Sequence, residues 1–289
     1  MIADYFYYDG ISSKVYDLII ASFSGSEDGT QEMGNVEITT IKAPRSNNFL
    51  RANATYNQAL QMTFSIVKMN CNDAKDIFFS EREIAFISRW LARKDYKPLK
   101  FVQEGWENIH YNAILKVDQH MSGGQCVGFD ITATCDAPWG YDQKQTTHIS
   151  ADVPDALGFK GTALIHDDSD VIGNIYPEII IDVLSDTDIE IENKLAKTVT
   201  KIRNCVEGER ITISNFSIES DECIPDDTGK TYDYIGRHKT LYDDFNYTWL
   251  PITNYFTPNN TRDSRVNEIE VTGNCRIILN WYSPRKAVV

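Results

Sequence analysis

The sequence contains few basic residues, and this scarcity limits the partners that the protein can bind. Its 289 residues include 28 lysines and arginines against 42 aspartates and glutamates, which gives a formal net charge of −14. Residues 1–150 carry a net charge of −4 and residues 151–289 carry −10. Because affinity for nucleic acids depends on basic side chains that neutralise phosphates, we expect no stable nucleic-acid binding.

Long apolar runs and a regular cysteine spacing are also missing. The first residues lack a basic segment followed by an apolar run, so we expect no secretory signal, no membrane span and synthesis in a cytoplasm. The six cysteines contain no CxxC pair and stand at positions 71, 126, 135, 205, 223 and 275. Several occupy apolar strand positions, which favours buried free thiols but leaves their redox state open.

Familiar catalytic and cofactor motifs are missing as well. The sequence has no nucleophile elbow, P-loop, dinucleotide fingerprint or zinc-protease motif. Residues 166–170 hold acids at alternate positions, but Ile172 and Ile179 stand where two EF-hand ligands belong, so a solvated loop is favoured over a metal site. We expect no catalytic, cofactor-binding or metal-binding residue and no enzymatic activity.

The remaining side chains that could take part in catalysis or binding are scattered along the sequence. The five histidines, expected to be surface or packing residues, are His110, His120, His148, His166 and His238. The adjacent acids Asp243 and Asp244, or Asp226 and Asp227, could serve a glycosidase, but such loop pairs are usually solvated. Aromatic residues that could stack on sugars or fill a partner's pocket are Trp249, Tyr255, Phe256, Trp281 and Tyr282. We expect Trp281 in the core, whereas Tyr255 and Phe256 could face outward.

One amphipathic helix stands out among strand patterns. Ser80 and Glu83 have the spacing of a capping box, and Ile84, Ile87, Trp90 and Leu91 fall on one helical face. Alternation over 111–117 and 127–135, joined by a turn at 122–124, predicts a long hairpin. Pro138 and Gly140 then mark the end of a first domain, at residue 141.

The rest of this domain is predicted to consist mainly of strands. The expected strands lie at 5–8, 15–23, 36–41 and 60–66. Residues 43–57 are polar and predict a loop of about fifteen residues, longer than compact domains usually contain. A protruding arm and a disordered segment both remain open for this loop.

A second domain, 151–289, is expected after a linker at 142–150. Its pattern shows no helical period, and its expected strands lie at 175–183, 189–191, 210–214, 268–272 and 276–281. A long polar loop is expected at 221–247. Short strands at such spacing predict a β-sandwich.

The order of these segments resembles the phage distal tail protein family of long flexible tails. The segments that carry the resemblance are 6–13, 17–20, 87–91, 99–101, 111–113, 137–141, 174–182, 189–193, 208–213 and 267–273. They extend over nearly the whole chain, but none is a reaction signature. The family's usual glycine after the basic turn near Arg45 is absent, and Ser46 stands there instead.

The resemblance implies a mainly β protein with a specific architecture and role. Its first domain, 1–141, would be a β-barrel-like fold with one α-helix that forms a hexameric ring, and its second a galectin-like β-sandwich. The ring would link the tail tube to tail-tip or baseplate hub proteins in the virion, surround the DNA exit channel, and assemble in the host cytoplasm. The alternative is a carbohydrate-binding module for host-surface glycans, because a galectin-like fold does not by itself establish a function.

Overall fold

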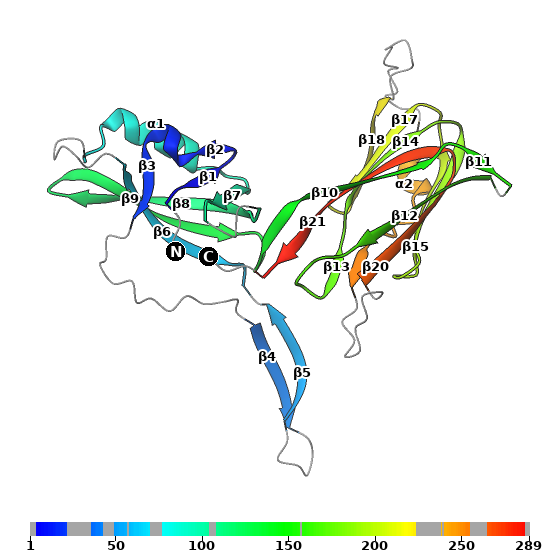
Figure 1. Cartoon of the computed structure of the whole chain (residues 1–289), viewed down its shortest axis with the longest axis horizontal. Coiled ribbons are helices and arrows are strands. Elements are labelled where there is room, and N and C mark those ends of the chain that lie inside the picture. Colours follow the sequence, from blue (N-terminus) through cyan, green and yellow to red (C-terminus); the bar gives the residue numbers. More distant parts are fainter. Residues whose placement is uncertain are drawn as a thin grey trace. The chain divides into compact units, whose positions relative to one another are not determined.

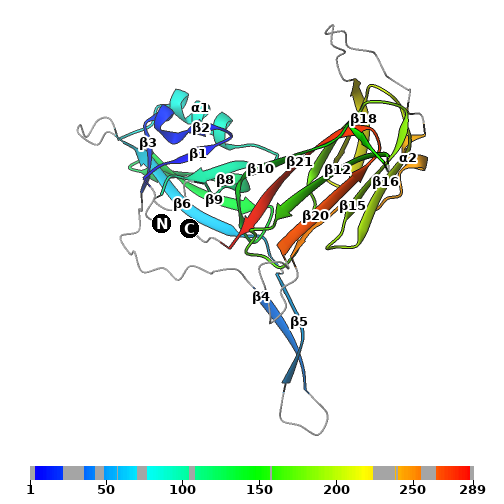
Figure 2. The same cartoon turned by 45° about the vertical axis from the view of Figure 1, so that its right-hand side comes forward.

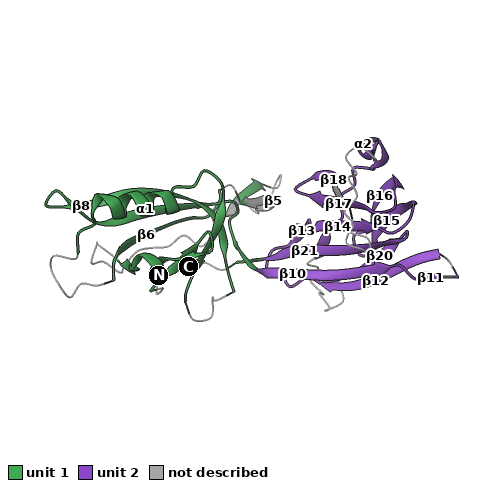
Figure 3. Ribbon diagram, turned by 90° about the horizontal axis from the view of Figure 1, so that it is seen from above, with its two compact units in different colours: residues 1–142, 284–289 green, residues 143–283 purple. Residues whose placement is uncertain are grey.

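The computed structural model shows a chain built mainly from antiparallel strands (Figure 1). It describes residues 4–21, 36–42, 49–56, 58–69, 77–103, 108–156, 158–223, 238, 240–254 and 265–286. The chain folds into two compact units, residues 1–142 with 284–289 and residues 143–283 (Figure 3). It therefore passes from one unit to the other twice. Within the described residues, no helix is long and apolar enough to cross a membrane.

Residues 142–150, predicted to be a linker, instead form most of a strand. This strand, β10 (Gly140–Ala151), lies beside β21 (Cys275–Arg285) in the same sheet. The polar composition that suggested a linker supplies hydrogen bonds across this pair: Thr146 Oγ1 donates to Asn280 Oδ1 at 2.8 Å. The linker prediction was wrong because polar strands and polar linkers have similar compositions.

Unit 1 is organised around a seven-stranded sheet with the order β2-β1-β7-β8-β9-β6-β3. The strands are β1 (Phe6–Tyr8), β2 (Ile11–Ser12), β3 (Leu18–Ala21), β6 (Gln61–Lys68), β7 (Lys97–Phe101), β8 (Tyr111–Ser122) and β9 (Gln125–Cys135). At one edge, the Ile20 N–H on β3 donates to the Asp4 carbonyl, just before β1, at 2.9 Å. This bond brings the outer strand back to the start of β1, which gives the sheet a barrel-like curl.

The strand predicted at 15–23 begins later than expected. Residues Ser13–Tyr16 form a 3-10 helix, η1, because the Ser12 side chain accepts a hydrogen bond from the Lys14 N–H and Asp17 adopts a left-handed φ of 53°. In the described part of this range, Leu18–Ala21 pair as a strand against β6, and residues 22 and 23 lie outside the described residues. Local side-chain capping therefore overrides the apolar strand pattern here.

The predicted hairpin is present as β8 and β9, with one change of side-chain direction. A register shift follows His120, so that Met121 pairs with Cys126 and His120 pairs with Gly128. The extra residue is Val127, which is half-buried, whereas Cys126 is buried in its place. Simple alternation from 127 to 135 places Val127 on the buried face, and the bulge is the reason that Cys126 is buried there instead.

The helix α1 (Glu81–Leu91) has the predicted capping box. Ser80 Oγ accepts from the Glu83 N–H, and the Ser80 N–H donates to Glu83 Oε2 at 2.7 Å. Lys68 Nζ lies 2.7 Å from Glu83 Oε1. Partial burial alone would raise the pKa of Glu83, but the hydrogen bonds from Lys68 and Ser80 outweigh it and lower the pKa to about 2.

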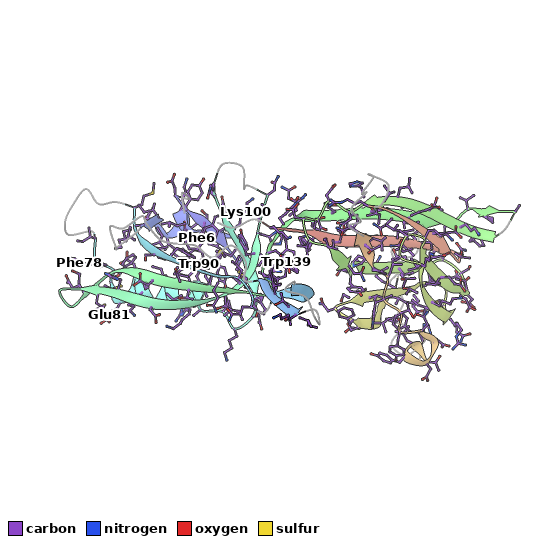
Figure 4. All side chains as sticks on the ribbon, turned by 90° about the horizontal axis from the view of Figure 1, so that it is seen from below. Phe6, Phe78, Glu81, Trp90, Lys100 and Trp139 are labelled. Carbon is purple, nitrogen blue, oxygen red and sulfur yellow. The ribbon has the colours of Figure 1, made fainter. Side chains whose placement is uncertain are left out.

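Trp90 is the main contact between α1 and the sheet. Its ring stacks on Phe6 with a centroid distance of 5.6 Å and on Tyr16 at 4.9 Å. Its Nε1–H donates to the Tyr8 carbonyl at 2.9 Å. Trp90 and Phe6 lie together in the interior of the unit (Figure 4). The indole thus buries its ring and satisfies its polar atom together.

Residues 49–56, predicted to lie in a loop, form a strand. This strand, β5 (Phe49–Tyr56), pairs with β4 (Val36–Lys42) in a separate two-stranded sheet. The rest of the predicted loop, 43–48 and 57, lies outside the described residues. A hairpin without a core beneath it needs no apolar face, so its sequence resembles a loop.

Unit 2 is a β-sandwich of two five-stranded sheets, with the orders β10-β21-β14-β17-β18 and β11-β12-β20-β15-β16 (Figure 2). The further strands are β11 (Pro154–Asp155), β12 (Gly158–His166), β14 (Glu178–Val183), β15 (Thr187–Asn193), β16 (Thr198–Cys205), β17 (Glu209–Ser214), β18 (Ser217–Cys223) and β20 (Val266–Thr272). Isoleucines from both sheets form one core, with Ile181, Ile191 and Ile269 fully buried. The galectin-like form of this sandwich remains a prediction.

Two small elements complete unit 2. The strands β13 (Gly173–Ile175) and β19 (Ile252–Asn254) pair with each other, and α2 (Leu241–Asp244) is a single helical turn. The predicted loop at 221–247 thus begins inside β18 and ends beyond α2. Residues 224–237 and 239 lie outside the described part of the chain.

Among the described residues, four cysteines are free and buried: Cys126, Cys135, Cys205 and Cys275. This matches the expectation of buried thiols for these four. Burial is the largest cause that raises the pKa of Cys135 and of Cys275 to about 12. These thiols are therefore protonated and poorly nucleophilic at neutral pH.

We expect Trp90→Ala to destabilise the protein by about 3–5 kcal/mol, because it removes a buried ring and leaves a cavity. Phe86→Ala is the matched control, since Phe86 lies on the same helix but is 44% exposed. Denaturant unfolding of both variants checks this. Equal stability losses in the two variants would contradict the assignment of Trp90 as the anchor of α1.

Candidate functional site

The β4–β5 hairpin exposes apolar side chains that no strand of unit 1 covers. Ile38 and Ile41 on β4 are each 60% exposed. In the described part of the chain, the two strands pair only with each other. Two-stranded hairpins are marginally stable alone, and exposed strand edges accept further strands. The hairpin therefore has the properties of a segment that packs against another chain.

Exposed aromatic rings form a second surface, on unit 2. Phe216 contacts Tyr176 at a centroid distance of 4.9 Å and Trp249 at 5.6 Å. Phe216 is 60% exposed and Tyr176 is 47% exposed. The three rings line a shallow pocket with about 10 Å³ of space, barely enough for one water molecule. Such a surface suits stacking on a flat ligand rather than enclosing one.

Phe216 occupies this surface through an unusual backbone. It follows Asn215 at the tip of the β17–β18 hairpin, and both residues have positive φ, 58° and 49°. Glycine usually takes this second turn position, because side chains are strained there. The sequence analysis did not identify Phe216 and Tyr176 as candidate binding residues. Asn215, which lies between two alternating runs, is a hairpin-turn signal that could have located Phe216 at the tip of a hairpin.

The predicted aromatic candidates separate into three groups. Trp281 is buried, as expected, and Trp249 belongs to the exposed surface. Tyr282 is 42% exposed. Tyr255 and Phe256 lie outside the described residues.

The run at 166–170 is not the solvated loop that its sequence suggests. Asp167 and Ser169 are buried, and Asp167 Oδ1 accepts from the Ser169 N–H at 2.9 Å. Asn254 Nδ2 donates to Ser169 Oγ at 2.9 Å, which ties this run to β19. His166 Nδ1 lies 2.7 Å from Asp168 Oδ1 at the surface. The prediction was wrong because exposed and buried residues alternate along 166–170, and the amino-acid composition does not show which of them are buried.

The histidines behave differently from one another. Four are exposed or half-buried: His110, His120, His148 and His166. His238 instead has a side chain only 2% exposed, between Glu209 and Asp244. Together with Cys205, these residues form a buried polar cluster that spacing did not indicate, because its members are separated by up to 39 residues, from Cys205 to Asp244.

The adjacent acids do not form a glycosidase pair. Asp243 is exposed, whereas Asp244 is buried and accepts hydrogen bonds from Thr240 Oγ1 at 2.5 Å and Asn204 Nδ2 at 2.8 Å. The hydrogen bond from Thr240 is the largest cause that lowers the pKa of Asp244. Asp226 and Asp227 lie outside the described residues.

Comparisons with known proteins agree with this fold. The model of a phage tail protein N-terminal domain matches residues 1–137, and that of the corresponding phage tail C-terminal domain matches residues 139–281. A comparison with curated proteins gives no match.

The Dit protein (gp 19.1) of phage SPP1 has a similar structure. The TM-score is 0.58 at 12% sequence identity, over 96% of this chain and 98% of that one. That protein is described as a paradigm of the hub adsorption apparatus in phages that infect Gram-positive bacteria. A Bacillus thuringiensis Cry1Da tryptic core variant gives a TM-score of only 0.21 at 9% identity, over 98% of this chain and 51% of that one, which carries no weight.

Together, the two family models match nearly the whole chain, at residues 1–137 and 139–281. The chain belongs to a family of phage tail proteins.

Proposed function

We propose that six copies of this protein form a ring at the distal end of a phage tail. The ring links the tail tube to tail-tip or baseplate proteins and surrounds the channel through which DNA leaves. Family membership supports a structural place in the tail of the virion. The likeness to SPP1 Dit, a hub protein by its description, supports the position at the tip.

The observation that carries the ring is the β4–β5 hairpin. A closed ring needs two different complementary surfaces on each copy. Exposed Ile38 and Ile41 supply apolar area on one of them, and within the described residues the outer edges of the hairpin pair with no further strand. Because the hairpin belongs to unit 1, we assign ring formation to unit 1.

The chemistry of the described residues favours a passive structural role. Asp243 and Asp244 do not act as a carboxylate pair, and the buried thiols have raised pKa values. We therefore propose that the protein is not an enzyme, and that it assembles in the host cytoplasm before it enters the virion.

We expect purified full-length protein to form six-fold rings, visible by negative-stain microscopy and by sedimentation. The double variant Ile38→Lys/Ile41→Lys should remain folded but shift strongly toward monomers, because charged side chains replace buried apolar contacts. Leu164→Lys is the matched control, since Leu164 is a 72% exposed strand residue of unit 2. Rings that survive the double variant would exclude the hairpin as the contact, and wild-type monomers at high concentration would exclude the ring.

The negative charge suits a channel wall that DNA passes without binding. A net charge of −14 leaves few cations to neutralise phosphates. A true DNA-binding protein loses affinity with a log-log slope of about −0.9 per phosphate contact as salt rises.

We therefore expect no shift of duplex DNA in a gel, even at low ionic strength, where attraction is strongest. A basic DNA-binding protein run in parallel provides the positive control. Micromolar binding that weakens with salt would contradict the passive channel.

The aromatic surface of unit 2 supports a second candidate function, glycan binding at the host surface. Sugar rings stack on exposed aromatic faces, and the exposed Phe216 and Tyr176 rings meet edge to face, with the partly buried Trp249 in edge-to-face contact with Phe216. The strained position of Phe216 is consistent with a functional constraint on that turn. This function is compatible with the ring.

If the surface binds glycans, Phe216→Ala should weaken binding of the intact protein to a host cell-wall glycan array at least about tenfold, the loss of roughly 1.4 kcal/mol of contact. Tyr242→Ala is the control, because Tyr242 is 62% exposed outside this surface. Equal binding by both variants, or none by wild type, would remove this candidate.

A further inference from the structure

The buried cluster around His238 contains three types of metal ligand. Cys205 ends β16, Glu209 begins β17, and His238 approaches from further along the chain. Their ligand atoms all lie within 4.8 Å of one another, and all three residues are buried. Among the described residues, no other group of three or more such side chains meets in this way.

The local fold fixes two of these side chains close together. Cys205 and Glu209 flank the tight turn between β16 and β17, where Gly208 has a φ of 78° and the Glu209 N–H donates to the Val206 carbonyl at 3.1 Å. Glu209 is held further by the Val206 N–H, which donates to its Oε2 at 3.0 Å. The thiol and the carboxylate are therefore positioned before any ion binds.

The imidazole is oriented from both sides. Its Nδ1 lies 2.7 Å from Glu209 Oε1. Among the described residues, its buried Nε2 has no hydrogen-bond partner, and Asp244 Oδ2 lies 3.5 Å away. Metal-bound histidines commonly direct their second nitrogen to a carboxylate in this way. Asp244 is itself fixed by Thr240 and Asn204.

We propose that Cys205, Glu209 and His238 bind one divalent transition-metal ion, with Asp244 positioning the imidazole from the second nitrogen. A sulfur, a nitrogen and a carboxylate oxygen suit Zn²⁺, which accepts all three types in tetrahedral sites. Glu209 and Asp244 are two buried acids, and a bound cation would compensate their charge together with Arg203, whose Nε lies 4.0 Å from Asp244 Oδ1. The ion would join residue 238 to the β16–β17 turn and so act structurally.

This proposal departs from the expectation of no metal site. The competing explanation is a protonated His238 that bridges Glu209 and Asp244 as a buried ion triad. That arrangement compensates the two acids equally well, and the Cys205 thiol then stays in the core of unit 2 and donates to the Ile202 carbonyl at 3.6 Å. The two explanations differ in whether sulfur contacts a cation, which spectroscopy detects directly.

Cobalt substitution tests the proposal. Full-length protein stripped with a chelator should bind one equivalent of Co²⁺ with a thiolate-to-cobalt absorption band, and Zn²⁺ should displace it. Cys205→Ser should abolish the band, whereas Cys126→Ser, the same change at a buried cysteine of unit 1, should keep it. The melting temperature of wild type should fall on chelation and recover with Zn²⁺.

A measurement on wild type alone guards against a variant that fails to fold. X-ray absorption of the zinc-loaded protein should show one sulfur at about 2.3 Å and nitrogen or oxygen ligands at about 2.0–2.2 Å. Several sulfur ligands, or none, would overturn the assignment. So would the absence of stoichiometric metal binding together with a melting temperature that chelation does not change, since a protonated triad predicts both.

Discussion

The pairing of β10 with β21 is the constraint on which the two-unit architecture depends. These strands come from opposite ends of unit 2, and each continues into unit 1 at one end. Side chains reinforce the pair along its length: Arg285 donates to Asp142 at 2.7 Å, and Arg276 donates to Asp152 at 3.0 Å. Without this pairing, one sheet of the sandwich would lose its edge strand, and the returning segment would lose its anchor.

Polar groups inside the sandwich are tolerated because they satisfy one another. Asn193 donates to the Asn267 side chain at 2.8 Å and to the Pro251 carbonyl at 2.6 Å. Asn267 Oδ1 also accepts from the Thr253 N–H at 2.9 Å. Buried amides that lacked such partners would each cost about 1–3 kcal/mol. This network therefore fixes the position of β19 against β15 and β20, although Thr253 Oγ1 on β19 is buried without a hydrogen-bond partner among the described residues.

The two units differ in the groups that remain available for binding. Unit 1 has a β hairpin with exposed isoleucines, which suits contact with further chains, whereas unit 2 has a cluster of aromatic rings and the buried group of Cys205, Glu209 and His238. The proposed ring needs a surface for further copies of the chain as well as surfaces for other tail components. The division between the units is consistent with that need, because each surface rests on a core of its own.

Local patterns in the sequence determined the elements whose signals are complete within a few residues. The capping box of Ser80 and Glu83, the apolar face that contains Trp90, and the β8–β9 hairpin are of this kind, and the structure confirms each. The mainly β class followed from the same alternation. The order of segments also identified the family, because order and spacing are properties of the chain itself.

Tertiary structure alone decided the features that depend on distant partners. Residues 142–150 became a strand because β21 supplies hydrogen bonds more than 120 residues away. Likewise, Cys205, Glu209 and His238 meet only after the β16–β17 turn and the approach to α2 are in place. Composition describes which groups a segment carries, but burial and pairing depend on what the fold brings opposite them, and no local pattern contains that information.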